Sequence, residues 1–162
     1  MEKHPPAFTL VELIVSIAII GLLSSIVLVL LNTTHKKARD AQRIEDMREI
    51  QKALEIYYTK HGFYPSTSGA WRGTELSGGV SCYGNHGNNA IPGLAPAYIP
   101  QIPRDPKPST NFCYLYRSDG KDYKFLAHQT METCNPGACP LQDPQRSSQR
   151  TSAVFSPGAR NW

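Results

Sequence analysis

Long runs of positive charge are absent from this sequence. Lysine and arginine together number 17 against 13 acidic residues, so the formal net charge is only +4. Nucleic-acid-binding proteins gather basic residues on one face or in one stretch, whereas here they are spread along the chain. Catalytic patterns are missing too, because the five histidines are scattered and no nucleophile elbow, phosphate-binding loop or zinc-binding helix occurs. We therefore predict neither a nucleic-acid partner nor an enzyme.

Cysteine is scarce, and no pair has the Cys-x-x-Cys spacing typical of a zinc site. All four cysteines follow an apolar segment near the start of the chain: Cys82, Cys113, Cys134 and Cys139. An even number on one side of such a segment fits disulfides formed in an oxidising compartment, with reduced thiols or zinc as alternatives. Of the three possible pairings, we prefer Cys134–Cys139 with Cys82–Cys113, because the first two enclose a tight turn.

Charge is also missing from residues 13–31, which are apolar apart from a few small residues. As a helix this segment would be about 28 Å long, close to the thickness of a bilayer's hydrocarbon core. A secretory signal peptide would be shorter and would precede a small-x-small cleavage site, which residues 32–37 do not offer. We therefore predict a retained membrane-spanning helix. The basic residues that follow it would place the C-terminal side in the cytoplasm, whereas the cysteines favour the opposite orientation.

Glu12 is an isolated carboxylate among apolar residues at the start of this segment. An unpaired carboxylate in lipid costs roughly 3 kcal/mol or more, so such residues tend to have partners and roles. One interpretation is local, because Thr9-x-x-Glu12 matches a capping box and a helix N-terminus favours an acidic side chain. A functional role is compatible with that cap.

Residues 8–15 read Phe-Thr-Leu-Val-Glu-Leu-Ile-Val, and they resemble the N-terminal motif of the type IV pilin and type II secretion pseudopilin family. The resemblance implies that residues 1–7 are a leader and that a prepilin peptidase cleaves between Ala7 and Phe8 on the cytoplasmic face. It also implies that the new amine of Phe8 is methylated, with the N-terminus cytoplasmic and the head outside the bacterial inner membrane. Two features depart from the family pattern: Ala7 replaces the usual glycine, and residues 28–30 lack the proline that many members carry.

The same resemblance suggests a partner for Glu12. If Glu12 of one subunit neutralises the amine of Phe8 in its neighbour, the cost of moving both charges out of water falls. We expect this pair, with Thr9 beside it, to set the register between subunits while the apolar helices pack in a filament core. The implied partners are copies of the chain, other pilin-like subunits, the prepilin peptidase, an inner-membrane assembly platform and the lipid bilayer.

The helix is predicted to continue through residues 35–60. Apolar residues recur there at three- and four-residue steps, at Ala41, Ile44, Met47, Ile50 and Leu54. Gly62 suits a left-handed helix cap, and Pro65 forbids continuation. We therefore predict one long helix, with a transmembrane and assembly half over residues 8–34 and an amphipathic half over residues 35–60.

Residues 61–140 are predicted to form a small globular head. Asp119-Gly120 lies between two alternating runs, which predicts a β-hairpin near residues 111–129. Residues 141–162 are polar and aperiodic, and we predict a flexible tail there. The fold class is therefore α+β and pilin-like, with the long helix packed on a small antiparallel sheet and loops.

Major pseudopilins often bind calcium in a C-terminal loop, and the resemblance makes Asp105, Asp119 and Asp122 weak candidates. Turn chemistry accounts for these residues without a metal, and no spaced run of oxygen ligands occurs. We therefore expect no cofactor, with calcium as the alternative.

The predicted function is a structural subunit of a type IV pilus-like or type II secretion pseudopilus filament, at the cell surface or in the periplasm. The Pro-Arg-Asp-Pro and Tyr-x-Tyr patterns of the head resemble major pseudopilins, whereas four cysteines and a long tail favour a surface pilus. The alternative is a single-pass membrane-anchored binding protein that does not polymerise.

Overall fold

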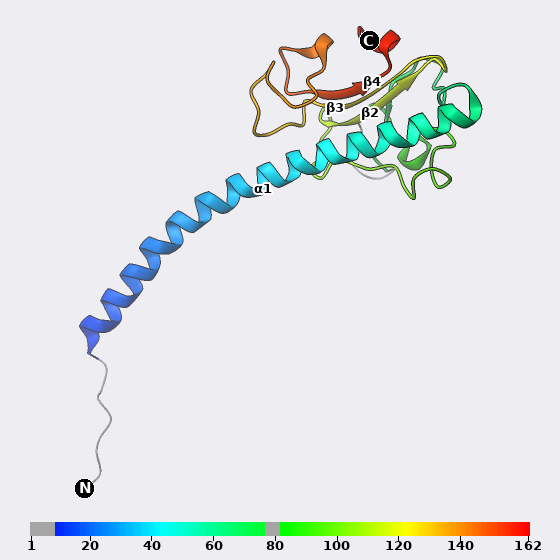
Figure 1. The fold of residues 1–162 in the computed structure, drawn as a ribbon. Helices are drawn as coiled ribbons and strands as arrows, with labels where there is room; N and C mark the ends of the chain where they lie inside the picture. The colour runs from blue at the N-terminus through cyan, green and yellow to red at the C-terminus, as the bar shows by residue number, and fades with distance from the viewer. Residues whose placement is uncertain (1–8, 77–81) are drawn as a thin grey trace. The chain divides into compact units, whose positions relative to one another are not determined.

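The computed structural model describes residues 9–76 and 82–162, leaving out the side chains of 26–30. The chain divides into two compact units, residues 1–36 and residues 37–162. Helix α1 (Leu10–His61) provides the described structure of the first unit apart from Thr9, and its later turns belong to the second (Figure 1). The predicted long N-terminal helix is confirmed.

Helix α1 ends where the glycine signal predicts. Gly62 has a φ of +76°, a left-handed conformation that glycine adopts without the steric cost of a Cβ atom. Its backbone N–H donates to the carbonyl of Tyr58 at 2.7 Å, which satisfies one of the carbonyls left open at the helix end. The chain then leaves towards Pro65, which cannot extend the helix.

A four-stranded antiparallel sheet forms the centre of the second unit, in the order β1–β2–β3–β4 (Figure 1). Its strands are β1 (Arg72–Gly73), β2 (Cys113–Ser118), β3 (Tyr123–His128) and β4 (Ser152–Phe155), and short 3₁₀ turns cover η1 (Gly87–Asn89), η2 (Pro144–Arg146) and η3 (Pro157–Ala159). The hairpin between β2 and β3 lies within the predicted range, with Ser118 opposite Tyr123. Asp119 orders its turn by accepting the backbone N–H groups of Lys121 and Asp122. The predicted α+β, pilin-like fold class is confirmed.

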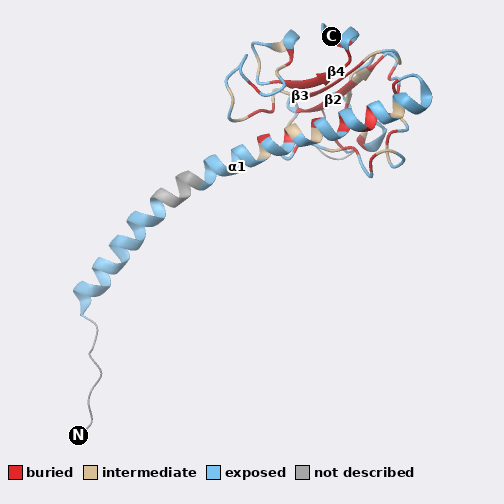
Figure 2. Cartoon of the chain, in the orientation of Figure 1, coloured by how far each residue is buried: buried red, intermediate tan, exposed pale blue. Residues whose placement is uncertain are grey.

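The main core lies between one face of the sheet and the part of α1 that belongs to the second unit. Figure 2 shows buried residues along the strands and along the facing side of the helix. Alternate residues of β2 and β3 point towards the helix, as the two-residue period of a strand requires. The buried side chains of this layer include Met47, Ile50, Leu54, Tyr114, Tyr116, Tyr123 and Phe125. The predicted apolar stripe needs one correction, because Ala41 is exposed whereas Asp40 and Arg43 are buried.

The prediction of a flexible tail over residues 141–162 is wrong. This segment contains η2, strand β4 and η3, and β4 pairs with β3 from Phe155 opposite Lys124 to Ser152 opposite Ala127. The physical reason is that buried hydrogen bonds hold a polar segment in place. Lys124 Nζ donates to Asp143 Oδ1 at 3.0 Å and to the carbonyls of Arg160 and Trp162 at 2.9 and 3.0 Å.

Both edges of the sheet are bridged by other segments of the same chain. At the β1 edge, Gly73 forms a parallel bridge with Asn85. At the β4 edge, Ser152 bridges Gln142, and the backbone N–H of Ala153 donates to the carbonyl of Leu141 at 2.8 Å.

Candidate assembly site

The first part of α1 exposes a continuous apolar surface. From Leu10 to Leu23, its large aliphatic side chains are between 51% and 73% exposed. Soluble monomers rarely expose so large an apolar surface, which is the mark of a protein-protein or membrane contact. In the part of the chain that the structure describes, no helix is both long and apolar enough to cross a membrane. The side chains of residues 26–30, inside the predicted span, lie outside that description.

Glu12 is the acidic residue of the first helical turn, and its carboxylate is held by Thr9. Oε2 of Glu12 accepts the backbone N–H of Thr9 at 2.9 Å and the Thr9 hydroxyl at 2.8 Å. The backbone N–H of Glu12 in turn donates to Oγ1 of Thr9 at 3.3 Å. These reciprocal bonds form the capping box that the spacing predicts, and they satisfy donors that a helix N-terminus leaves open.

Both contacts to the Glu12 carboxylate use the same oxygen. Among the described residues, Oε1 of Glu12 receives no hydrogen bond, so it can take a further donor without breaking the cap. The predicted cleavage residues, Ala7 and Phe8, lie outside the described residues. The cleavage and methylation of this site therefore stay predictions.

In the second unit, Arg43 of α1 lies at the centre of a buried cluster of charges. Its guanidinium donates to both carboxylate oxygens of Asp105, at 2.8 and 2.9 Å, and to Asp40 at 2.8 Å. It also donates to Glu132 at 3.0 Å, and Glu132 is bound in addition by Arg39. Burial alone would lower the pKa of Arg43, but the hydrogen bond and charge of Asp105 outweigh it and raise that pKa.

The carboxylates of this cluster tie loops to the helix. Asp40 accepts the backbone N–H groups of Glu132 and Thr133. The hydrogen bond from Arg39 is the main reason that the pKa of Glu132 is lowered to about 2. The cluster thus joins α1, the extended segment at residues 99–105 (the connector), which carries Asp105, and the loop that carries Glu132.

The structure pairs Cys82 with Cys113 and Cys134 with Cys139, the pairing preferred from the sequence. The first disulfide lies on the outer face of the sheet among Leu115, Leu126 and Ala153. The second closes a short loop that directly follows Glu132 and Thr133. The first disulfide therefore ties the segment at Cys82 to strand β2, and the second closes a short loop beside the charge cluster.

The three calcium candidates have other partners. Asp105 binds Arg43, and Asp119 caps the hairpin turn. Oδ1 of Asp122 accepts the hydroxyl of Ser156 at 2.6 Å and the backbone N–H of Gly158 at 3.1 Å. The structure does not bring the three together, and within residues 9–76 and 82–162 no group of His, Cys, Asp and Glu side chains is arranged to hold a metal ion.

The sequence interpretation missed the charge cluster and the buried Lys124–Asp143 pair. A signal for the first was present, because Asp40, Arg43, Met47, Ile50 and Leu54 follow the same three- and four-residue steps as a buried stripe. No local signal marks Lys124, whose partners follow it by 19 to 38 residues.

Two curated relatives match the chain. It is 33% identical over 67 residues to the type II secretion system core protein G of Dickeya chrysanthemi, covering 41% of this chain and 44% of that protein. It is 32% identical over 66 residues to the protein of the same name from Aeromonas hydrophila, covering 41% of this chain and 46% of that protein. These matches support the pseudopilin family.

The chain spans less than half the length of these two pseudopilin relatives. No family model matches it, and no solved structure matches it significantly. Its long helix on a four-stranded antiparallel sheet is a pilin-like arrangement, in keeping with the pseudopilin family.

Proposed function

We propose that this chain is a structural subunit, without enzymatic activity, of a type II secretion pseudopilus. One observation carries the proposal: the exposed apolar surface of α1 includes Glu12, whose Oε1 receives no hydrogen bond from the described residues and is open to a further donor. The two pseudopilin relatives support the same role. The apolar surface would hold the subunit in the inner membrane as a single span before assembly, with the head outside, and would pack against other subunits afterwards.

In this proposal, the prepilin peptidase removes residues 1–7 and the amine of Phe8 is then methylated. The ammonium of Phe8 in one subunit donates to Glu12 of the next, while Thr9 continues to hold Oε2. Because both charges are costly in an apolar surrounding, pairing them favours one axial register over all others.

N-terminal processing is the first test. Intact-mass measurement and N-terminal sequencing of protein extracted from a bacterial membrane should give a chain that starts at methylated Phe8. A chain that retains Met1 through Ala7 would contradict the proposal and would favour an anchored protein that does not polymerise.

The second test replaces Glu12 by alanine. Glu12→Ala should leave the protein in the membrane fraction but abolish filaments sheared from cells that express the secretion machinery. Ser16→Ala is the matched control, because Ser16 lies one turn further along the same exposed helix and its hydroxyl donates only to the backbone carbonyl of Glu12. Ser16→Ala should keep a normal filament yield, and a normal yield from Glu12→Ala would disprove the role of the carboxylate.

A further inference from the structure

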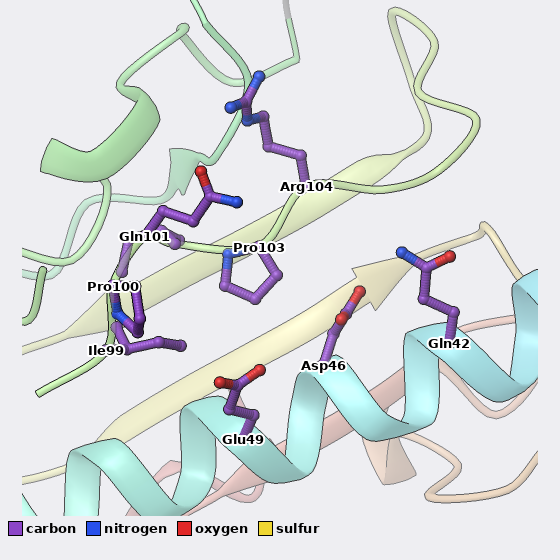
Figure 3. Close-up of a pocket in the computed structure, with 9 residues that line it drawn as sticks. Gln42, Asp46, Glu49, Ile99, Pro100, Gln101, Pro103 and Arg104 are labelled. Carbon is purple, nitrogen blue, oxygen red and sulfur yellow. The ribbon is translucent and has the colours of Figure 1, made fainter. Parts of the chain in front are cut away.

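The second unit has a groove between α1 and residues 99–104 of the connector. Its volume is about 440 Å³, and Figure 3 shows side chains from both elements facing it. Gln42, Asp46 and Glu49 line it from the helix, at the spacing of successive turns on one helix face. The connector contributes Ile99, Pro100, Gln101, Ile102, Pro103 and Arg104.

The groove combines residues of the connector, anchored by two buried isoleucines, with carboxylates on its helical side. Ile99 and Ile102 are at most 4% exposed, and the backbone N–H of Ile102 is held by Asn88 at 3.0 Å. Asp46 is half-buried, and its Oδ2 accepts the hydroxyl of Tyr114 at 2.8 Å, which fixes the carboxylate in place. The groove is therefore built by buried contacts on the connector side and by the Tyr114 contact on the helix side.

The charges of the groove are not balanced. Of the nine described residues that line it, two are acidic and one, Arg104, is basic. Burial raises the pKa of Asp46, the hydrogen bond from Tyr114 opposes this, and the nearby charges of Glu49, Asp105 and Glu45 raise it further. A cation placed in the groove would relieve this repulsion. A lysine suits its shape because an aliphatic stem can lie on the accessible rings of Pro100 and Pro103 while the ammonium meets the carboxylates.

The chain itself carries exposed lysines that could supply this cation. Lys36 and Lys37 are exposed on α1, separated from Leu31 by four polar residues. Among the described residues neither forms an ion pair, whereas the next basic residue, Arg39, is already bound by Glu132.

We infer that the groove of one copy receives the Lys36–Lys37 pair of a second copy. This inference rests on the proposed function, because it names a contact between the helix of one copy and the groove of the next that would accompany packing of the apolar helices. The groove and the lysine pair are different parts of the chain's surface, so the contact is heterologous. A heterologous contact that does not close into a ring propagates as an open helical filament.

Chemical cross-linking of filaments tests the contact. Filaments assembled from equal amounts of ¹⁴N- and ¹⁵N-labelled full chain are treated with a carbodiimide, which joins a lysine amine directly to a carboxylate in contact with it. Mass spectrometry should find mixed-isotope peptides that join Lys36 or Lys37 to Asp46 or Glu49. Intact filaments whose mixed-isotope cross-links map elsewhere would overturn the inference and leave the proposed function standing.

Charge reversal provides the second arm. Glu49→Lys should cause loss of the cross-link and a lower filament yield, and adding Lys36→Glu and Lys37→Glu to the same chain should restore the yield. Glu45→Lys is the matched control, because Glu45 is exposed one turn away and does not line the groove. An equal loss of filament yield in Glu45→Lys and Glu49→Lys would overturn the inference. So would a yield that Lys36→Glu and Lys37→Glu do not restore. Absence of filaments from the unaltered chain would instead defeat the proposed function, and the inference with it.

Discussion

Arg43 shows how much one side chain can hold together. Its side chain is 1% exposed, and its guanidinium binds carboxylates from α1, from the connector and from the Glu132 loop. A buried ion pair is weak evidence for net stability, but removal of Arg43 would leave the buried Asp105 without its ion-pair partner. Glu132 would keep Arg39, and Asp40 would keep its bonds to the Glu132 loop. The cluster thus specifies how two loops attach to the helix.

Arg43→Met should lower the free energy of unfolding of the full chain in detergent by roughly 3–5 kcal/mol, because Asp105 and Asp40 lose their buried partner. Urea unfolding followed by tyrosine fluorescence measures this. Arg48→Met is the control, since Arg48 is exposed and its ion pair with Glu45 is 3.9 Å long. Arg48→Met should change the free energy of unfolding by less than about 1 kcal/mol. Equal effects of the two variants would show that the cluster does not hold the loops.

The lowered pKa of Glu132 predicts that the free energy of unfolding falls at acidic pH. Its pKa is lowered from 4.5 to about 2 in the folded chain, mainly by Arg39. The stabilisation it contributes is therefore present above the unfolded value and is lost as pH falls from about 4.5 towards 2. Comparing urea unfolding at pH 7 and pH 3, the loss of stability should be smaller in Glu132→Gln than in the unaltered chain. If Glu132→Gln lost as much stability between pH 7 and pH 3 as the unaltered chain, Glu132 would not be the source of this pH dependence.

At the scale of elements, strand β4 and the residues after it depend on a buried lysine. Lys124 and Asp143 are both fully buried, and Arg146 also binds Asp143 at 2.7 Å. The lysine is the common donor that joins β3, η2 and the segment after η3.

Lys124→Met should destabilise the fold by about 3 kcal/mol, at the low end of the range for broken buried pairs because Arg146 still neutralises Asp143. Amide hydrogen exchange should speed up in residues 156–162 before it does in β2. The control is Lys121→Met in the exposed hairpin turn, which should change stability by no more than about 0.5 kcal/mol. Unchanged exchange in residues 156–162 would show that Lys124 does not anchor them.

The sequence predicts those elements whose signals are local. The period of α1, the glycine at its end and the Asp119-Gly120 turn all act within a few residues, and the structure has each of them. Strand β4 is only four residues long and begins with a buried serine, so its hydrophobic pattern is too short to stand out. Its stability comes from partners such as Lys124 that are distant along the chain, which composition does not reveal. At the candidate site the Thr9–Glu12 cap was predictable from spacing, whereas the groove depends on how the connector folds back to α1.

At the scale of the whole molecule, the two disulfides should contribute unequally. Cys82 and Cys113 are 31 residues apart in sequence, and Cys134 and Cys139 are 5 apart. In the chain-entropy model, a longer closed loop restricts the unfolded chain more, which gives about 3.7 kcal/mol for the first and about 2.2 kcal/mol for the second.

Replacing both cysteines of one pair by serine and measuring urea unfolding should therefore show the larger loss of stability for Cys82→Ser with Cys113→Ser. The control for effects of the new serine hydroxyls is the unaltered chain with both disulfides reduced. Its free energy of unfolding should fall by more than that of either variant. A larger loss from the Cys134 and Cys139 variant would mean that its loop acts mainly through the Arg43 cluster rather than through the unfolded state.

Because both edges of the sheet are bridged within the chain, crowded copies have less opportunity to pair through their strands. Unpaired strand edges are where folded proteins join by adding strands to one another, and this is the first step of edge-to-edge aggregation. Here Asn85 lies against β1, and Gln142 and Leu141 lie against β4. In the proposed filament, where many heads would be close together, these bridges would oppose strand addition between heads, so that each subunit would remain separate from its neighbours.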